Sequence, residues 1–179
     1  GGVVQYDEYF KETNLYSKHV LFEKLDIDLN KKTIFYCLES PTAYKWNPAV
    51  IDLLGRQIDS GVIEQDTQVV IRPHPIYYRV ENGVFVYEKD INELKELEKK
   101  YPFIVFDHPD VHSGKMSYDM PTSQTLKLGS LLKHSDLVIC FYSSINIEAS
   151  IMDTPIINVG IHHKRNLPNE VMANHAHNK

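Results

Sequence analysis

The sequence predicts an α/β domain in which helices cover both faces of a parallel β-sheet. Two observations predict it. Short apolar runs rich in β-branched and aromatic residues alternate with longer stretches whose apolar residues recur every three or four positions. The short runs are apolar on both faces, which is typical of buried parallel strands. The 179 residues suit one domain, and the crossovers between its strands should be right-handed.

The first third of the chain predicts a helix, a strand and a second helix. Apolar residues at helical spacing predict a helix over residues 6–25, and the run TIFYCL predicts a buried strand over 33–38. Asn47 is a good N-cap residue and Pro48 suits the first helical position, so a helix should begin there. We expect it to end near Gly61.

The middle of the chain predicts two more strands around a turn and a charged helix. The run QVVIRP should form a strand that Pro73 ends, and Asn82-Gly83 before VFVY suggests a small hairpin. The expected elements are a strand over 68–73, a hairpin including 84–87, a helix over 90–100 and a strand over 103–106.

The last third begins with a long polar loop, residues 107–121, of a kind that is usually functional or mobile. Leucines at helical spacing follow it, and then two apolar runs flank a short helical pattern. The expected elements are a helix over 124–134 capped by Ser123, a strand over 136–141, a helix over 144–152 and a strand over 155–160.

Composition excludes several classes of protein. The net charge of −5 argues against a nonspecific nucleic-acid binder, which would present a basic face. No apolar run approaches the roughly 18 residues that suggest a transmembrane helix. Cys37 and Cys140 both lie inside apolar runs without CxxC spacing, so we expect two buried core thiols and a location in the reducing cytosol.

Both ends of the sequence suggest a piece of a longer protein. The opening Gly1-Gly2-Val3-Val4 reads as an internal stretch, and residues 161–179 show no apolar periodicity. We therefore expect one domain over 1–160 followed by an irregular tail over 161–179.

A pair of hydroxyls stands where the fourth predicted strand ends. In an open parallel sheet, ligands bind beyond the carboxyl ends of the strands, near helix N-termini. Ser143 and Ser144 fall at such a position and could donate to phosphate oxygens. Glu148 follows one turn later on the same helix face, where a carboxylate could accept both hydroxyls of a ribose. The alternative is a serine N-cap followed by a solvated glutamate.

The second predicted strand ends in a cationic segment. Arg72 and His74 stand at this strand end, and two prolines stiffen the backbone around His74. A guanidinium and an imidazole there would neutralise a pyrophosphate or the charge developing on a leaving group. The alternative is a structural turn with an exposed histidine.

Together these segments resemble the C-terminal, nucleotide-binding half of GT-B glycosyltransferases, in particular bacterial surface-polysaccharide transferases and CDP-glycerol glycerophosphotransferases. Such enzymes carry an R/K-x-H-P segment after one strand, here RPHP at 72–75. They also carry a segment that reads here SDLVICFYSSINIEASIMDTPIIN, at 135–158. The stretch VVQYDEYF at 3–10 resembles the hinge where their second domain begins, and the resemblance covers roughly residues 1–160.

The resemblance implies a Rossmann-like sheet that is one half of a GT-B fold, and it assigns roles to single residues. Ser143, Ser144 and His74 would meet the donor phosphates, Glu148 would meet the ribose, and Arg72 would assist. His74 and Arg72 are thus the candidate catalytic residues, acting on the leaving diphosphate without a metal ion or other cofactor.

The resemblance also implies partners and a place in the cell. The chain would be the donor-binding domain of a cytoplasmic transferase that makes capsule or other surface polysaccharide from a nucleotide-sugar or CDP-alditol donor. The acceptor, a glycan or a lipid-linked molecule, would bind the other half, which this chain lacks. The resemblance allows peripheral association of the full protein with the inner face of the membrane, and no nucleic acid is expected as a partner.

Several alternatives stay open. The glycerophosphotransferases often have Asp before YSS where this chain has Phe141, so their substrate does not transfer. A nucleotide-sugar 2-epimerase would share the fold and donor site, and a flavodoxin-like interaction module would use the serines only as caps. The loop residues Asp107, His108, Asp110 and His112 could hold a divalent ion, although a polar loop at the ligand mouth is favoured. In such a loop, His108 or Ser113 could contact the base or sugar of the donor.

Three common motifs of enzymes are absent from the sequence. Ser144 lacks the G-x-S-x-G flanks of a hydrolase nucleophile elbow. Neither G-x-G-x-x-G nor G-x-x-x-x-G-K-[ST] occurs, which disfavours NAD-dependent enzymes and P-loop ATPases.

Overall fold

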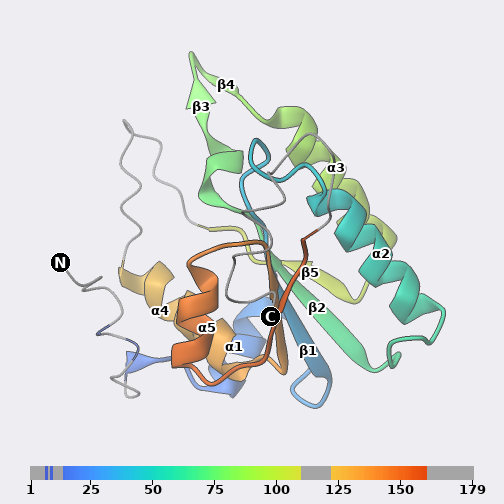
Figure 1. The fold of residues 1–179 in the computed structure, drawn as a ribbon, viewed down its shortest axis with the longest axis vertical. Coiled ribbons are helices and arrows are strands. Elements are labelled where there is room, and N and C mark those ends of the chain that lie inside the picture. The colour runs from blue at the N-terminus through green and yellow to red at the C-terminus, as the bar shows by residue number, and fades with distance from the viewer. Residues whose placement is uncertain (1–6, 8, 10–13, 110–121, 161–179) are drawn as a thin grey trace.

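The chain forms one parallel sheet with helices on both faces, as the sequence predicts (Figure 1). The computed structural model describes residues 7, 9, 14–109 and 122–160. Its main sheet has five strands in the order β5-β2-β1-β6-β7, and every neighbouring pair is parallel. The strands are β1 (Lys32–Cys37), β2 (Thr67–Arg72), β5 (Ile104–Phe106), β6 (Leu137–Cys140) and β7 (Ile156–Asn158).

The strand order is that of a Rossmann-like α/β fold. From β1 the chain adds β2 and then β5 on one side, and it returns to place β6 and then β7 on the other side of β1. The order therefore reverses between β1 and β6. Such a reversal leaves a crevice at the carboxyl ends of the two strands, which is where open α/β sheets bind ligands.

Helices cover the two faces of the sheet in two groups, which Figure 1 shows on either side of the strands. On one face lie α1 (Lys18–Leu25), α4 (Thr122–His134) and α5 (Ile145–Ile151). On the other lie α2 (Asn47–Asp59) and α3 (Glu88–Lys100). None of the helices in the described part of the chain combines the length and apolar character that crossing a bilayer requires.

Alternate residues of each strand supply two separate cores. In β1, Ile34 and Tyr36 pack under α2 and α3, whereas Phe35 and Cys37 pack under α1, α4 and α5. This is why the strands read as apolar on both faces. The predicted burial of both thiols is confirmed, and burial raises the pKa of the Cys140 thiol to about 12.

A short ribbon follows β2 and projects from the carboxyl edge of the sheet (Figure 1). It consists of the 3₁₀ turn η3 (Pro75–Tyr78) and the hairpin β3 (Val80–Glu81) and β4 (Val84–Phe85). Asn82 and Gly83 have φ of 51° and 80°, the left-handed values that a tight hairpin turn needs. The predicted hairpin is confirmed, and so is the predicted stop of α2, where Gly61 has φ of 74°.

The predicted helix over residues 6–25 is wrong in its extent, because α1 begins only at Lys18. Ser17 has an extended backbone, and its side chain accepts a hydrogen bond from the Val20 amide. Just before it, the Tyr16 amide donates to Ser130 Oγ at 2.9 Å, and the Tyr16 carbonyl oxygen lies 2.9 Å from His134 Nε2. Both partners lie on α4, so tertiary hydrogen bonds replace the helical ones.

Two predicted helix caps are also wrong. The Asn47 side chain does not cap α2 but lies fully buried, where it donates to the Glu39 carbonyl and the Tyr77 hydroxyl and accepts from the Tyr36 hydroxyl. Ser123 lies inside α4, which begins at Thr122. The predictions for residues 110–121 and for the tail 161–179 lie outside the described residues, and the division into domains stays a prediction.

The Asn47→Ala variant should unfold with a free energy about 3–5 kcal/mol lower than that of the wild type, because three polar groups lose their partner and each costs at least about 1 kcal/mol. Urea unfolding measures this. The matched control is Asn92→Ala on the exposed face of α3, which should change stability little. Equal effects of the two substitutions would contradict the buried role of Asn47.

Candidate functional site

The predicted site residues come from the ends of two strands on either side of β1. β2 ends at Arg72, which Pro73 and His74 follow, and β6 ends at Cys140, four residues before Ser144. Because β2, β1 and β6 are parallel neighbours, both ends lie at one edge, about 10 Å or two strand spacings apart. The structure therefore brings the cationic segment and the two serines to the same edge of the sheet.

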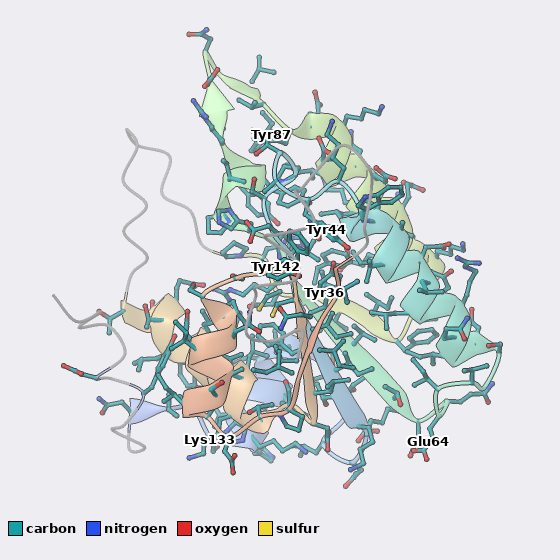
Figure 2. The ribbon with its side chains drawn as sticks, in the orientation of Figure 1. Tyr36, Tyr44, Glu64, Tyr87, Lys133 and Tyr142 are labelled. Atoms are coloured by element: carbon teal, nitrogen blue, oxygen red, sulfur yellow. The ribbon has the colours of Figure 1, made fainter. Side chains whose placement is uncertain are left out.

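An aromatic stack lies at the reversal point of the strand order. Tyr44, from the loop after β1, stacks on Phe141, from the loop after β6, with ring centroids 4.2 Å apart and planes 17° apart. Figure 2 shows Tyr44 and Tyr142 at this edge, with Glu64 and Lys133 toward the opposite edge. Phe141 is thus a core residue that joins the two loops, and an aspartate at its position would have to be buried against Tyr44.

A buried amide holds the turn between β6 and α5. Tyr142 takes a left-handed backbone with φ of 35°, and the Ser143 carbonyl accepts from the Asn146 backbone N–H at 3.1 Å and from its Nδ2 at 2.9 Å. Asn146 also exchanges two hydrogen bonds with Asn158 of β7. Sequence reasoning missed Asn146, although a polar residue two positions after Ser144, at the start of a short helix, could have indicated that its side chain stabilises the turn.

The two serines present hydroxyls rather than unpaired amides. Ser143 is half-buried and Ser144 is exposed. The backbone N–H groups of residues 145–148 all donate to oxygen atoms of these two serines within the turn. Because these four amides already have acceptors, a phosphate at this helix end would be held mainly by the serine hydroxyls.

Glu148 lies beneath these serines and is buried, with 5% of its surface exposed. Its Oε2 accepts a hydrogen bond of 2.5 Å from the Tyr9 hydroxyl, and the Ser144 hydroxyl also bonds to it. Burial raises the pKa of Glu148, and the two hydroxyls and the charge of Arg72 oppose that rise. The alternative of a solvated glutamate is therefore wrong, and the carboxyl group already binds hydroxyls.

His74 begins the turn η3 and is half-buried. Its Nδ1 accepts from the Ile76 amide at 3.2 Å, so the proton of the neutral ring resides on Nε2. Burial lowers the pKa of His74, while the charge of Glu39 opposes the change. The imidazole is thus a neutral, oriented hydrogen-bond donor, not the exposed histidine of the alternative interpretation.

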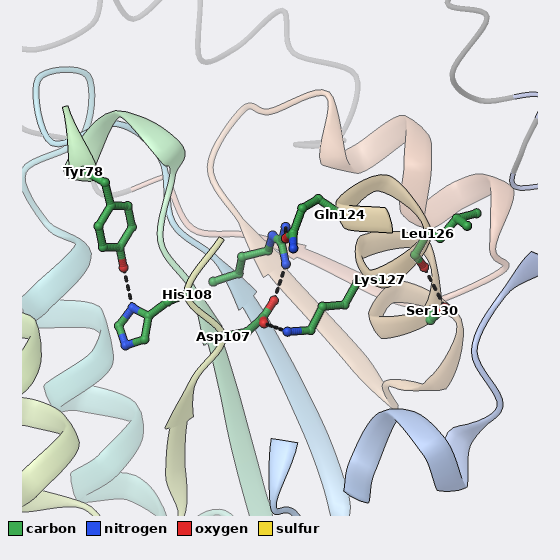
Figure 3. A network of polar contacts seen from close by, with 8 residues as sticks. Tyr78, Asp107, His108, Gln124, Leu126, Lys127 and Ser130 are labelled. Carbon is green, nitrogen blue, oxygen red and sulfur yellow. Dashed lines mark hydrogen bonds and ion pairs between the residues drawn. The ribbon is translucent and has the colours of Figure 1, made fainter. Parts of the chain in front are cut away.

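Arg72 is committed to a buried network. Its guanidinium is paired with Asp107 at the end of β5 and donates to Gln124 Oε1 at 2.9 Å. The second oxygen of Asp107 is paired with Lys127. Figure 3 shows Gln124 and Lys127 extending from α4 toward this network. Arg72 is therefore fully engaged by Asp107 and Gln124. Sequence reasoning named Asp107 only as a possible metal ligand and missed Gln124 and Lys127.

The beginning of the polar loop carries a second contact. His108 lies beside Tyr78 of η3, with Nδ1 at hydrogen-bonding distance from the phenol oxygen (Figure 3). The His108 ring also stacks on Phe106, with centroids 5.9 Å apart. Among the described residues, no three His, Cys, Asp or Glu side chains are grouped to hold a metal ion. Asp110, His112 and Ser113 lie outside the described residues, so the loop alternatives stay untested.

Comparisons with known proteins add little to these observations. No family model and no curated protein matches the sequence. Among solved structures, one of the wall teichoic acid polymerase TagF, soaked with CDPG, is similar with a TM-score of 0.44 and 16% identity over 85% of this chain. The chain spans 28% of that polymerase. Similarity at this level leaves the function to be argued from the residues of the chain itself.

The Asp107→Asn variant should lose about 3–5 kcal/mol of stability, because two buried or half-buried cations lose their shared anion. Chemical denaturation measures the loss. Asp59→Asn, at the exposed end of α2, is the control and should change stability by no more than about 0.5 kcal/mol. A wild-type unfolding curve for Asp107→Asn would show that the network does not hold this edge.

The stability of the wild type relative to Glu148→Gln should depend on pH. Because the pKa of Glu148 is raised above 4.5 on folding, the fold favours the protonated acid. The stability that this group contributes is complete below its unfolded pKa and is lost as the pH rises through its folded pKa. Unfolding at about pH 4 and about pH 8 should therefore show the variant gaining on the wild type at the higher pH. A constant difference would contradict the raised pKa.

Proposed function

We propose that the carboxyl edge of the sheet binds the nucleoside diphosphate part of an activated sugar or alditol. In this proposal the chain is the donor-binding half of a GT-B transferase for surface polysaccharide. The supporting observation is that Glu148, buried beneath Ser144 at the reversal point of the strand order, accepts a hydroxyl hydrogen bond. Reversal points are the ligand sites of open α/β sheets.

The chemistry of Glu148 suits a ribose. A carboxylate accepts several hydrogen bonds and can take both hydroxyls of a cis-diol. The Tyr9 hydroxyl occupies one such bond at 2.5 Å and stands in for a sugar hydroxyl. A protonated carboxyl could still accept through its carbonyl oxygen, so the raised pKa of Glu148 does not oppose this role.

The groups around Glu148 suit the diphosphate. The hydroxyls of Ser143 and Ser144 lie on one side of β1, and His74 lies on the other with its proton on Nε2. A nucleoside diphosphate is long enough to bridge two strand spacings. Arg72 and Lys127 share the single carboxylate of Asp107, so this network carries a net positive charge, which favours an anion beside it. The carboxyl groups of Glu39 and Glu148 lie near the same edge and reduce this effect.

The proposed reaction follows from these positions. His74 would donate a hydrogen bond to the departing diphosphate, and the charge of Arg72, held in place by Asp107, would stabilise the negative charge that develops there. The hydroxyl of a glycan or lipid-linked acceptor would lose its proton to a base in the other half of the enzyme. No metal ion is required by this proposal, so chelation should leave nucleotide affinity unchanged.

Calorimetry with CDP, UDP and GDP tests the proposal. At least one should bind the wild type, and Ser144→Ala should weaken its affinity about tenfold, because a hydrogen bond to a charged phosphate is worth about 1.5–3 kcal/mol. Ser60→Ala, on an exposed turn after α2, is the control and should bind as the wild type does.

Two outcomes separate this function from the alternatives. An interaction module on the same fold would bind none of the three nucleotides. A 2-epimerase would bind UDP and would also convert free UDP-N-acetylhexosamine, which a donor-binding half alone should not do.

A further inference from the structure

Tyr9 connects the beginning of the chain with the candidate site. It is separated from Glu148 by 139 positions, and its hydroxyl donates to Oε2 at 2.5 Å. Only 3% of the Tyr9 surface is exposed, so the side chain is an inserted group rather than a surface contact. The phenol thus lies in the interior beside α5, at the carboxyl group that we assign to the ribose.

A glycine of α4 makes room for the Tyr9 ring. A Cβ atom on Gly129 would lie 2.7 and 2.8 Å from two carbon atoms of that ring, closer than real contacts allow, and 3.3 Å from a methyl carbon of Leu15. Glycine is a poor residue for the middle of a helix. Its presence at the point where the ring packs indicates a notch that fits an aromatic side chain.

We propose that Tyr9 and the ribose of the donor compete for Glu148. The inference rests on the proposed function and concerns how that site is regulated. Because Glu148 is only 5% exposed, a ribose that reaches it must take the place of the phenol. The Tyr9 side chain therefore occupies the ribose position in the closed form of the site, and a nucleotide binds the open form, in which that side chain has left the Gly129 notch.

The competition has a direct thermodynamic consequence. A ligand that binds only the open form has its affinity reduced by the fraction of molecules that are open. The phenol offers one hydroxyl, whereas a ribose offers two, so a nucleotide can replace the bond that it breaks and add another. Weakening the Tyr9 contact without disturbing Glu148 should then tighten nucleotide binding.

Two substitutions on opposite sides of the contact test this. Tyr9→Phe keeps the ring in its notch and removes only the hydroxyl, and Gly129→Ala fills the notch and displaces the ring. Calorimetry with CDP, UDP and GDP should show that both variants bind the preferred nucleotide about tenfold more tightly than the wild type. Tyr87→Phe, at the start of α3, is the control and should bind unchanged.

A measurement on the unmodified protein removes any dependence on how the variants fold. Tetranitromethane nitrates accessible tyrosines, and mass spectrometry assigns the nitration to single residues. Tyr9 should react slowly in the free protein and faster when the preferred nucleotide is saturating.

The outcomes separate the competition from the function on which it rests. Two results would overturn the competition and leave the proposed function standing. In the first, the wild type binds a nucleotide and Tyr9→Phe binds it equally well or more weakly. In the second, the nucleotide slows the nitration of Tyr9. Absence of binding in the wild type and in both variants overturns the two together.

Discussion

The pairing of β1 with β2 on one side and with β6 on the other is the constraint on which the candidate site depends. Phe35 lies opposite Val70 of β2 and opposite Val138 of β6, and all three side chains enter the same core. A slip of one residue would move every side chain of a strand to the other face. The two cores therefore fix where each strand ends, and the loops that carry His74 and Ser144 arrive at one edge.

Buried polar groups then decide what this edge can do. Arg72 and Asp107 are nearly inaccessible to solvent. Burying such an ion pair costs desolvation free energy, which a pair of apolar residues in the same place would not. Because Lys127 of α4 is a second cation on Asp107, the network between β2, β5 and α4 fixes a net positive charge where the strands end. The charge of Arg72 acts on Glu148 and lowers its pKa, whereas burial raises that pKa by more. The edge thus combines a cationic field with a carboxyl group that binds hydroxyls.

The sequence predicts the elements that depend on local patterns, and it misses the contacts between residues far apart in the chain. The strands and the hairpin at 82–83 follow from apolar runs and turn residues, and the structure confirms them. The position of Glu148 on its helix was also predictable, but its bond to Tyr9 was not, since no local signal links residues so far apart. The predicted Asn47 cap was wrong for the same reason. Its side-chain amide is hydrogen-bonded to two tyrosines and a carbonyl group that only the fold brings together.

The most direct test of the central claim is a titration of the ¹⁵N-labelled protein with CDP, UDP and GDP, followed by two-dimensional NMR. The account predicts that one nucleotide shifts the amide resonances of His74, which precedes η3, and of Ser144 and Glu148 at the beginning of α5. Glu64 and Asp136, at the opposite edge, should stay unchanged. Shifts confined to that opposite edge, or no shifts at saturating nucleotide, would contradict it.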